Sequence, residues 1–142
     1  FDAPVYIAWS AVNRSPLIRI PSNKGEKTRV ELRCPDASAN PYLALAVCLA
    51  AGLDGIRNQI MPPKSIDRNI FGLSEQERQE MGIGMLPGTL IEAVQALEED
   101  PYIQNVLGDH MCRRYLEAKK AEWTAYRTQV TSWEIAEYLY KI

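Results

Sequence analysis

The sequence predicts an α+β chain, in which short antiparallel strands near the amino end precede a mostly helical carboxy-terminal region. Residues 3–33 contain three short apolar segments separated by turn-forming residues. From residue 40 onward the pattern becomes helical, and several helix-start signals follow one another along the chain. With 142 residues, 46% hydrophobic and 24% charged, the chain is long enough for one domain with its own core.

The three predicted strands are the segments "PVYIAW", "SPLIRIP" and "TRVELR". Turn material at Asn13 to Pro16 and the segment "PSNKGEK" separate them. Their spacing favours an antiparallel meander. A lone three-stranded sheet leaves its edges and one face uncovered, so we expect it to pack against other parts of the protein.

The first predicted helix begins at Asn40, a good N-cap residue, with Pro41 at the first helical position. It continues through an Ala- and Leu-rich run to about Gln59. Because this helix is apolar almost all round, we expect it to be buried. Capping-box spacing or an Asp-Pro pair predicts four further helix starts, at Ser74, Thr89, Asp100 and Thr131.

A longer amphipathic helix is predicted over residues 109–128, where large apolar side chains recur among many charges. The tail that follows, "SWEIAEYLYKI", is short and aromatic. Leaving its large side chains in water would forgo considerable burial, so we expect it to dock on its own chain or on a neighbouring one. The chain therefore divides into strands within residues 1–33 and a helical region at 40–142 that ends in a docking tail.

Charge and cysteine content restrict the functional class. A formal net charge of -2 gives no general attraction to nucleic acid or to anionic membranes, so we expect neither as a partner. The longest apolar run, "PYLALAVCLAAGL", is too short to cross a bilayer. Cys34, Cys48 and Cys112 are far apart and lack metal-ligand spacing, which indicates reduced thiols in a cytoplasmic protein, two of them in the core.

The most informative segment is "TRVELRCPD", because Arg29, Glu31 and Arg33 occupy every second position of a predicted strand. These three charges then share one face of the strand, with the apolar residues on the other. Pairing with the preceding strand would add Arg19, and Arg14 enters from the turn before it. The simpler interpretation is a solvated face with cross-strand ion pairs. The functional interpretation gains from the exclusive use of arginine on these strands, since arginine grips phosphate or carboxylate through two donors.

Between two guanidinium groups the Glu31 carboxylate should stay ionised, which suits it to bind Mg²⁺ or Mn²⁺ beside substrate phosphates. Several arginines with one metal-binding carboxylate favour phosphoryl transfer. The sequence has no second acidic cluster or Gly-rich phosphate loop, so further metal ligands must come from elsewhere. Cys34 lies beside Arg33, which could lower the pKa of its thiol, but no histidine near it in the sequence supports a nucleophile.

The segments "NRSPLIRIP", "TRVELRCPD", "ANPYLALAVCLAAGLDGIRN" and "YRTQV" together are more specific than any one of these features. They resemble the carboxy-terminal part of the catalytic domain of bacterial type I glutamine synthetase, and the likeness runs from "FDAP" to "SWEIAEYL". The chain also begins with strand-like residues and without Met, so we expect a piece of a longer polypeptide. The resemblance implies ATP-dependent ligation of glutamate and ammonia through γ-glutamyl phosphate, with two or three Mg²⁺ or Mn²⁺ ions.

Matched to the family's motifs, Glu31 would bind the metal that bridges the nucleotide phosphates. Arg14 would stabilise the transferring phosphoryl group, Arg19 and Arg29 would contact ATP, and Arg33 would hold the reacting end of glutamate. The arginines would thus hold the anions that the metal also touches.

Two positions depart from the pattern of many members. Asp2 stands where many have Glu on the flap that covers glutamate and helps to remove a proton from ammonium. Phe71 stands where adenylylated members carry the modified Tyr, so a non-adenylylated subtype, controlled by direct inhibitors or protein partners, is expected.

The resemblance also implies a double-ring dodecamer with active sites between subunits and the carboxy-terminal tail inserted into the opposite ring. Most metal ligands and the substrate loops of the family precede the matched region, so we expect this piece alone to be inactive. Two rival functions remain open. A ligase of the same fold that joins glutamate to a different amine would share these residues, and a non-catalytic relative would retain the fold for assembly, although it would not need the clustered charge.

Overall fold

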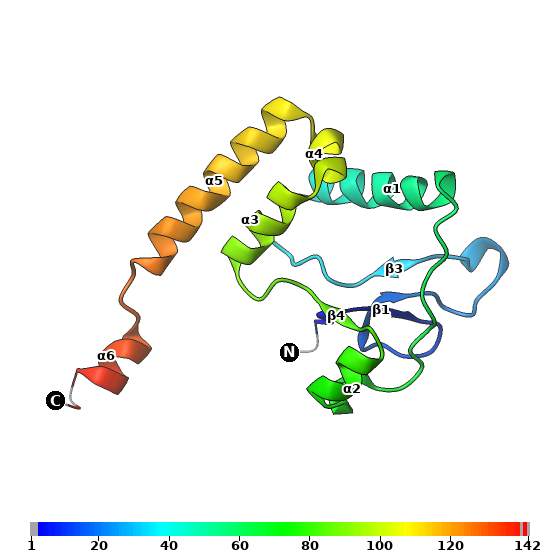
Figure 1. Ribbon diagram of the computed structural model, residues 1–142, viewed down its shortest axis with the longest axis horizontal. Coiled ribbons are helices and arrows are strands. Elements are labelled where there is room, and N and C mark those ends of the chain that lie inside the picture. The colour runs from blue at the N-terminus through cyan, green and yellow to red at the C-terminus, as the bar shows by residue number, and fades with distance from the viewer. Residues whose placement is uncertain (1–2, 140, 142) are drawn as a thin grey trace. The chain divides into compact units, whose positions relative to one another are not determined.

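The computed structural model describes residues 3–139 and residue 141 (Figure 1). The chain forms two compact units, one ending at Leu86 and the other beginning at Pro87. All of the described strands belong to the first unit, whereas the second is helical. The α+β class predicted from the sequence is therefore confirmed, and Asp2, one of the predicted site residues, lies outside the described residues.

The first unit contains a mixed four-stranded sheet in the order β3-β2-β1-β4. The strands are β1 (Tyr6–Ser10), β2 (Pro16–Arg19), β3 (Glu31–Leu32) and β4 (Gly84–Met85). β2 pairs antiparallel with β3, and β1 pairs antiparallel with β4, but β1 and β2 run parallel. The predicted three-stranded antiparallel meander is thus wrong, because its first pair is parallel and β4 joins the sheet from far along the chain.

The parallel pairing follows from side chains in the turn between β1 and β2. Parallel neighbours usually need a connection of roughly a dozen residues or more, whereas residues 11–15 form a short one here. The Ser10 hydroxyl accepts hydrogen bonds from the backbone amides of Val12 and Asn13, at 3.1 and 2.9 Å. The Asn13 side chain in turn accepts from the Ser15 amide at 3.0 Å. These local bonds stabilise a compact return, so β2 starts again beside Tyr6.

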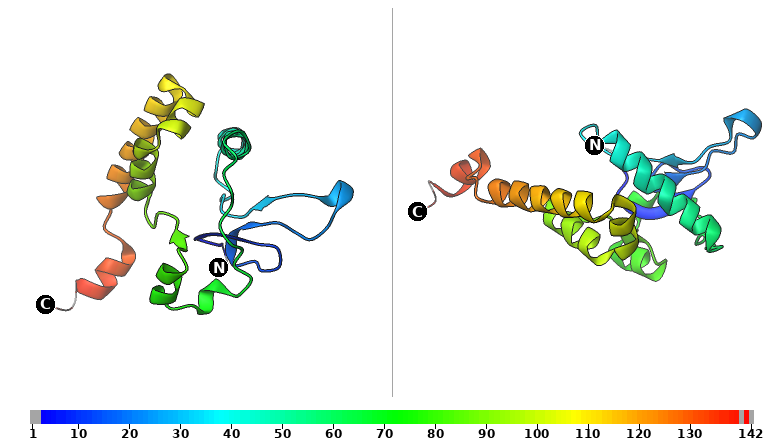
Figure 2. Two further views of the ribbon diagram at one scale, coloured as in Figure 1. Left: turned by 45° about the vertical axis from the view of Figure 1, so that its right-hand side comes forward. Right: turned by 90° about the horizontal axis from the view of Figure 1, so that it is seen from above.

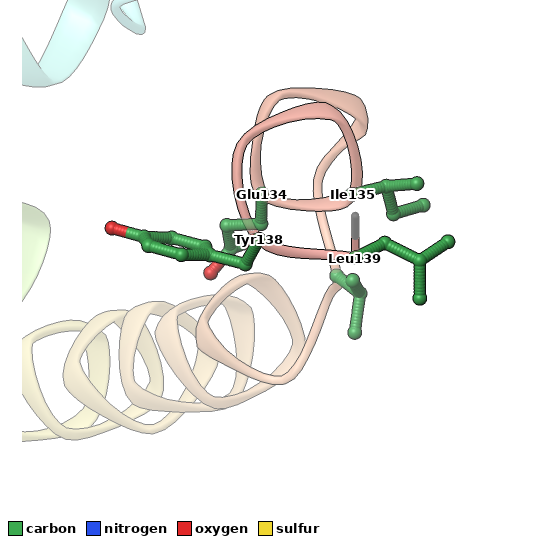
Figure 3. Close-up of a pocket in the computed structure, with 5 residues that line it drawn as sticks. Glu134, Ile135, Tyr138 and Leu139 are labelled. Atoms are coloured by element: carbon green, nitrogen blue, oxygen red, sulfur yellow. The ribbon is translucent and has the colours of Figure 1, made fainter. Parts of the chain in front are cut away.

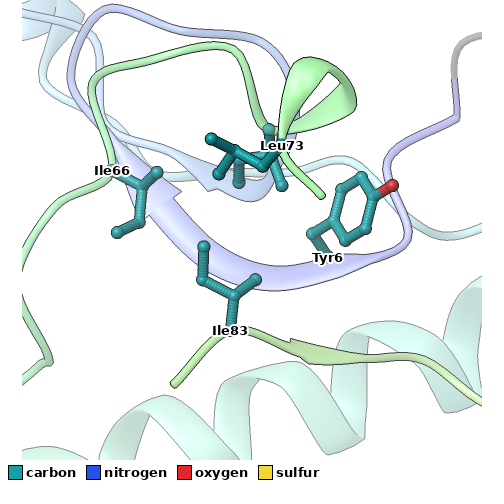
Figure 4. Close-up of a cluster of buried hydrophobic side chains, with 5 residues drawn as sticks. Tyr6, Ile66, Leu73 and Ile83 are labelled. Atoms are coloured by element: carbon teal, nitrogen blue, oxygen red, sulfur yellow. The ribbon is translucent and has the colours of Figure 1, made fainter. Parts of the chain in front are cut away.

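A hydrophobic core lies against β1 in the first unit (Figure 4). Its buried members come from β1 and from the segment between residues 66 and 83, and they are Tyr6, Ile66, Ile70, Leu73 and Ile83. The Ile66 amide donates to the Trp9 carbonyl at 2.9 Å, which holds the loop beside the strand. The Arg78 guanidinium lies 5.4 Å from the centre of the Tyr6 ring and extends this packing to α2 (Glu75–Glu80). The core therefore joins the loop that follows residue 61 to the sheet.

Helix α1 (Pro41–Arg57) starts as predicted, with the Asn40 side chain accepting from the amides of Tyr42 and Leu43. Its expected burial is wrong for the part of the chain that the structure describes, since no α1 residue is buried. Figure 2 shows α1 nearly end-on in its left view, with no other helix of this unit beside it. The apolar composition was read correctly, but the first unit supplies no surface that covers it.

The three cysteines differ in their burial. Cys112 is buried, Cys48 on α1 is exposed, and Cys34 is half-buried. The prediction that two of them occupy the core is wrong, because α1 places Cys48 on an uncovered surface.

Short helical turns complete the first unit. They are η1 (Gly25–Lys27) before β3 and η2 (Ile70–Gly72) before α2. At the start of α2, the Ser74 hydroxyl accepts from the Glu77 amide, and the Glu77 carboxylate accepts from the Ser74 amide. This reciprocal capping box confirms the helix start that the sequence predicted.

The second unit consists of α3 (Leu90–Glu99), α4 (Pro101–Leu107), α5 (Asp109–Arg127) and α6 (Ser132–Tyr138). Capping boxes at Thr89 and Thr131, and the Asp100 side chain before α4, confirm the predicted starts. α3, α4 and α5 pack together, with Val94 and Cys112 buried.

The carboxy-terminal helix α6 leaves its aromatic residues in solvent within the second unit. Trp133 and Tyr138 are 64% and 59% exposed, and their rings meet edge-on with centroids 5.8 Å apart. Figure 3 shows Tyr138 and Glu134 on one side of this short helix and Ile135 and Leu139 on the other, around a shallow, open pocket. None of the described residues of the tail is buried within the second unit, and docking of the tail on a neighbouring chain stays a prediction.

Candidate active site

The sheet register brings two predicted site residues into contact. In the antiparallel pair β2–β3, Arg19 lies directly opposite Glu31, and Ile18 lies opposite Leu32. Arg19 Nη1 donates to Glu31 Oε2 at 3.1 Å. The expected cross-strand placement of Arg19 beside Glu31 is therefore confirmed.

Arg29, two positions before Glu31 in the chain, also donates hydrogen bonds to this carboxylate. Its Nε and Nη2 atoms donate to Glu31 Oε1 at 2.9 and 2.7 Å. Two donors on one oxygen match the fork of a guanidinium group. Glu31 is thus held between two arginines, but the alternating pattern predicted Arg29 and Arg33, whereas the structure pairs Glu31 with Arg29 and Arg19.

The two arginines stabilise the ionised form of Glu31. Hydrogen bonds from Arg19, and then from Arg29, lower the pKa of the Glu31 carboxyl below its ordinary value. The Glu31 side chain remains 27% exposed, so its carboxylate is accessible as well as ionised at neutral pH. An ionised, accessible oxygen ligand is the type that Mg²⁺ and Mn²⁺ prefer.

Arg33 contacts backbone carbonyl groups of Leu17 and Arg14. The Arg33 amide donates to the Leu17 carbonyl at 3.0 Å, which continues the β2–β3 pairing past Leu32. The Arg33 Nη1 atom donates to the Arg14 carbonyl. The predicted arginines therefore lie along the β2–β3 pair, with Arg14 and Arg33 near the start of β2 and the Arg19–Glu31–Arg29 trio at its end.

The apolar side of these strands differs from the expectation. Val30 and Leu32 are exposed, because β3 is an edge strand and the core lies against β1 instead. The charged side chains of this face are therefore positioned by their ion pairs and not by packing of β3 on a hydrophobic core.

The thiol of Cys34 is not activated by its neighbour Arg33. Burial raises the pKa of the Cys34 thiol above its ordinary value, and this effect dominates. The suggestion that Arg33 lowers that pKa is therefore wrong.

Glu31 does not form a complete metal site with the other described residues. No group of three or more His, Cys, Asp or Glu side chains gathers at a point within residues 3–139 and 141. Mg²⁺ commonly takes only one or two protein carboxylates and completes its shell with phosphate oxygens and water. Glu31 fits as one ligand of such an ion.

Sequence reasoning missed the residues that hold the turn bearing Arg14. Ser10 is fully buried and donates to Asp67 at 2.8 Å, while the hydroxyl of buried Ser15 accepts from the Ile70 amide at 3.0 Å. These partners are separated by 57 and 55 positions. No local periodicity signals such contacts, because they depend on where the later loop packs.

Comparison with protein families decides the assignment of the chain. The family described as "Glutamine synthetase, catalytic domain" matches residues 1–138. The chain belongs to this family. It is 53% identical over 141 residues to a glutamine synthetase of Clostridium saccharobutylicum and 52% identical over 139 residues to one of Thermus thermophilus. These matches cover 99% and 98% of the chain, respectively, but only 32% and 31% of the two relatives.

Solved structures agree with the fold. A ligand-free structure of GmaS matches 96% of this chain, with a TM-score of 0.79 and 38% sequence identity, and the match covers 30% of the GmaS chain. A cryo-electron-microscopy structure of Plasmodium falciparum glutamine synthetase matches 97% of this chain, with a TM-score of 0.76 and 21% sequence identity, and the match covers 35% of the Plasmodium chain. The second likeness supports the fold alone.

The glutamine synthetase assignment confirms the family recognised from the sequence motifs. The chain spans about a third of the length of its curated relatives. The type I subtype, the absence of adenylylation and the role of each site residue remain predictions. Among the described residues, none of the helices is both long and apolar enough to traverse a bilayer.

Proposed function

We propose that this chain is the part of a glutamine synthetase that supplies phosphate-facing arginines and one metal-binding carboxylate. The parent would join glutamate to ammonia with ATP, through γ-glutamyl phosphate. The observation that carries the proposal is the Arg19–Glu31–Arg29 trio, set beside Arg33 and Arg14. Relatives named glutamine synthetase, at 53% and 52% identity over nearly the whole chain, support the assignment of this reaction.

The charge arrangement suits a reaction between two anions. ATP and glutamate repel each other, and fixed guanidinium groups offset this repulsion without reorganising during the reaction. Arg19 and Arg29 would contact ATP, Arg14 the transferring phosphoryl group, and Arg33 the reacting carboxylate of glutamate. Arg19 Nε is buried and has no acceptor among the described residues, so one donor of this guanidinium group is unused.

The Glu31 carboxylate has room for one metal ion. Its Oε1 atom accepts two hydrogen bonds from Arg29 and a longer one from Arg19, whereas Oε2 accepts from Arg19 Nη1 alone among the residues that the structure describes. A carboxylate oxygen offers about two lone-pair sites, so Oε2 keeps one available. A divalent ion bound there would neutralise charge on the nucleotide phosphates. Glu31 would hold that ion, while its two arginines keep the carboxylate ionised and oriented.

Asp2 would assist removal of a proton from ammonium, as a shorter replacement for the usual flap glutamate. Phe71 lies in η2 and lacks the hydroxyl that adenylylation requires. Regulation would therefore act through direct inhibitors or protein partners, in a cytoplasmic enzyme.

The exposed α6 helix supports the assembly that the family implies. Trp133 and Tyr138 lie in solvent within their own unit, and burying such side chains would stabilise a contact with another subunit. We therefore include a homododecamer in the proposal, with the tail docked on a neighbouring subunit. The isolated 142-residue chain should be inactive, because it supplies only part of the metal and substrate ligands.

The test uses the full-length parent and measures ATP- and Mg²⁺-dependent formation of γ-glutamylhydroxamate from glutamate and hydroxylamine. Glu31→Ala should lose activity on the order of 100-fold or more while the assembly stays intact. Glu26→Ala is the matched control, because Glu26 is an exposed carboxylate in η1 that lies outside the trio. Glu31→Gln should also require a higher Mg²⁺ concentration for half-maximal activity.

Two results would count against the proposal. Full activity in Glu31→Ala would remove the metal-binding role of this carboxylate. Absence of product from a correctly assembled wild type would point to a ligase that uses a different amine or to a non-catalytic relative.

A further inference from the structure

The loop between residues 62 and 70 is fastened to the turn that carries Arg14. Ser10 Oγ donates to Asp67 Oδ1 at 2.8 Å, and Ser15 Oγ accepts from the Ile70 amide at 3.0 Å. Trp9 Nε1 also donates to the Pro63 carbonyl at 2.7 Å. The loop therefore contacts the residues just before the turn at residues 11–15 and the last residue of that turn.

The Ser10 hydroxyl is fully used in this arrangement. It donates its single proton in a hydrogen bond to Asp67, and its oxygen accepts hydrogen bonds from the amides of Val12 and Asn13. Ser10 has no exposed surface, so water cannot replace a lost partner without rearrangement of the turn. Asp67 thereby fixes the rotation of a hydroxyl group that itself shapes the turn.

Arg14 lies in the middle of this held segment. Asn13, immediately before it, accepts from the amide of Ser15, immediately after it. The Arg14 carbonyl also accepts from Arg33 Nη1. Displacement of the turn would thus move the backbone of Arg14 and release one contact that orients Arg33.

We infer that Asp67 is a positioning residue for Arg14 and Arg33, acting through the Ser10 hydroxyl and the turn at residues 11–15. This inference rests on the proposed function, in which Arg14 faces the transferring phosphoryl group. Asp67 needs no contact with substrate for this role. The loop that contains it is a second support for the active site, in addition to the pairing of β2 with β3.

Substitutions at Asp67 separate positioning from charge. Asp67→Ala removes the acceptor of the buried Ser10 hydroxyl, whereas Asp67→Asn keeps an oxygen that can accept the same bond. Ser65 provides the matched control, because its hydroxyl donates to the other oxygen of Asp67, at 3.1 Å, and does not contact the turn. Ser65→Ala should therefore leave Ser10 bound to Asp67.

The first measurement is steady-state kinetics of the full-length parent in the hydroxamate assay. A misplaced group in the active site can reduce the rate by roughly 100-fold per ångström, so Asp67→Ala should lower kcat about tenfold. KM for ATP should change less than about twofold, since Arg14 acts on the transferring group. Asp67→Asn and Ser65→Ala should keep kcat within about twofold of wild type.

The second measurement is hydrogen exchange at the backbone amides of Val12 and Asn13 in the same proteins. Asp67→Ala should accelerate their exchange about tenfold, while Asp67→Asn and Ser65→Ala should not. This measurement needs no activity, so it distinguishes failure of the inference from failure of the proposed function.

The inference is overturned by any of three results: wild-type kcat in Asp67→Ala, an equal loss of kcat in Asp67→Asn, or unchanged exchange at Val12 and Asn13 in Asp67→Ala. If the wild type makes no product, the exchange result alone decides whether Asp67 holds the turn. A general loss of stability would accelerate exchange throughout the first unit, and it would also count against a specific positioning role.

Discussion

Truncation of Ile70 tests whether the core beneath β1 stabilises the loop and the turn near the site. Ile70 has no exposed surface, and it packs with Tyr6, Ile66, Leu73 and Ile83. Its amide is also the donor to Ser15. Removing its side chain should therefore loosen the core and the loop together.

The magnitude follows from the atoms that are lost. Ile70→Ala removes three carbon atoms, and at roughly 0.8 kcal/mol for each buried methylene this gives roughly 2.4 kcal/mol. A residual cavity of about 50 Å³, at about 24 cal/mol per Å³, adds about 1.2 kcal/mol. The free energy of unfolding of the first unit should fall by about 3.6 kcal/mol. Ile70→Val, which removes one carbon, should lower it by about 1 kcal/mol.

Native-state hydrogen exchange in the full-length parent measures this loss locally. The reporter is the amide of Ile66, which donates to the Trp9 carbonyl. A loss of about 3.6 kcal/mol corresponds to exchange that is roughly 400-fold faster. Ile60→Ala is the matched control, because Ile60 is 62% exposed, and it should change the stability by less than about 0.5 kcal/mol. Exchange no faster in Ile70→Ala than in Ile60→Ala would refute the assigned core.

Two further predictions concern charge and backbone conformation. Because the pKa of Glu31 is lowered in the folded state, its ion pairs contribute stability that is present above its ordinary pKa and lost as the pH falls through the lowered value. Denaturation measured from pH 7 to 3 should show that the free energy of unfolding falls less with acid in Glu31→Gln than in wild type. Identical dependence of the unfolding free energy on pH in the two proteins would contradict this. Gly108 has φ 76° and ψ 150°, a region nearly restricted to glycine. Gly108→Ala should therefore destabilise the second unit by roughly 1–3 kcal/mol, measured by exchange at the Cys112 amide, and an unchanged rate would oppose this reasoning.

Helix boundaries were the part of the fold most accessible from the sequence. The starts at Asn40, Ser74, Thr89, Asp100 and Thr131 all appear in the structure with their side-chain caps. A cap connects residues two or three positions apart, so its signal lies in a few adjacent letters. The family motifs were accessible for the same reason, since they are contiguous segments.

Sheet pairing and burial were less accessible. β4 joins β1 although 73 positions separate Gly84 from Ala11, the residue that follows β1, and the parallel β1–β2 pair depends on a compact turn. The apolar α1 helix is exposed in the described residues, because composition reports which side chains favour burial but not which surface covers them. Such features depend on packing between distant segments.

The sequence by itself determined that Arg29, Glu31 and Arg33 alternate along "TRVELR", a spacing that puts them on one face of an extended segment because successive side chains point in opposite directions. In the structure, β3 comprises only Glu31 and Leu32 of this segment. Only the tertiary structure decided that Arg19 reaches Glu31 across the β2–β3 register and that Asp67 holds the hydroxyl of Ser10. The physical reason is the range of each interaction. Strand alternation and helix caps are set by neighbouring residues, whereas the position of Arg14 depends on a loop more than fifty positions away that the core fixes in place.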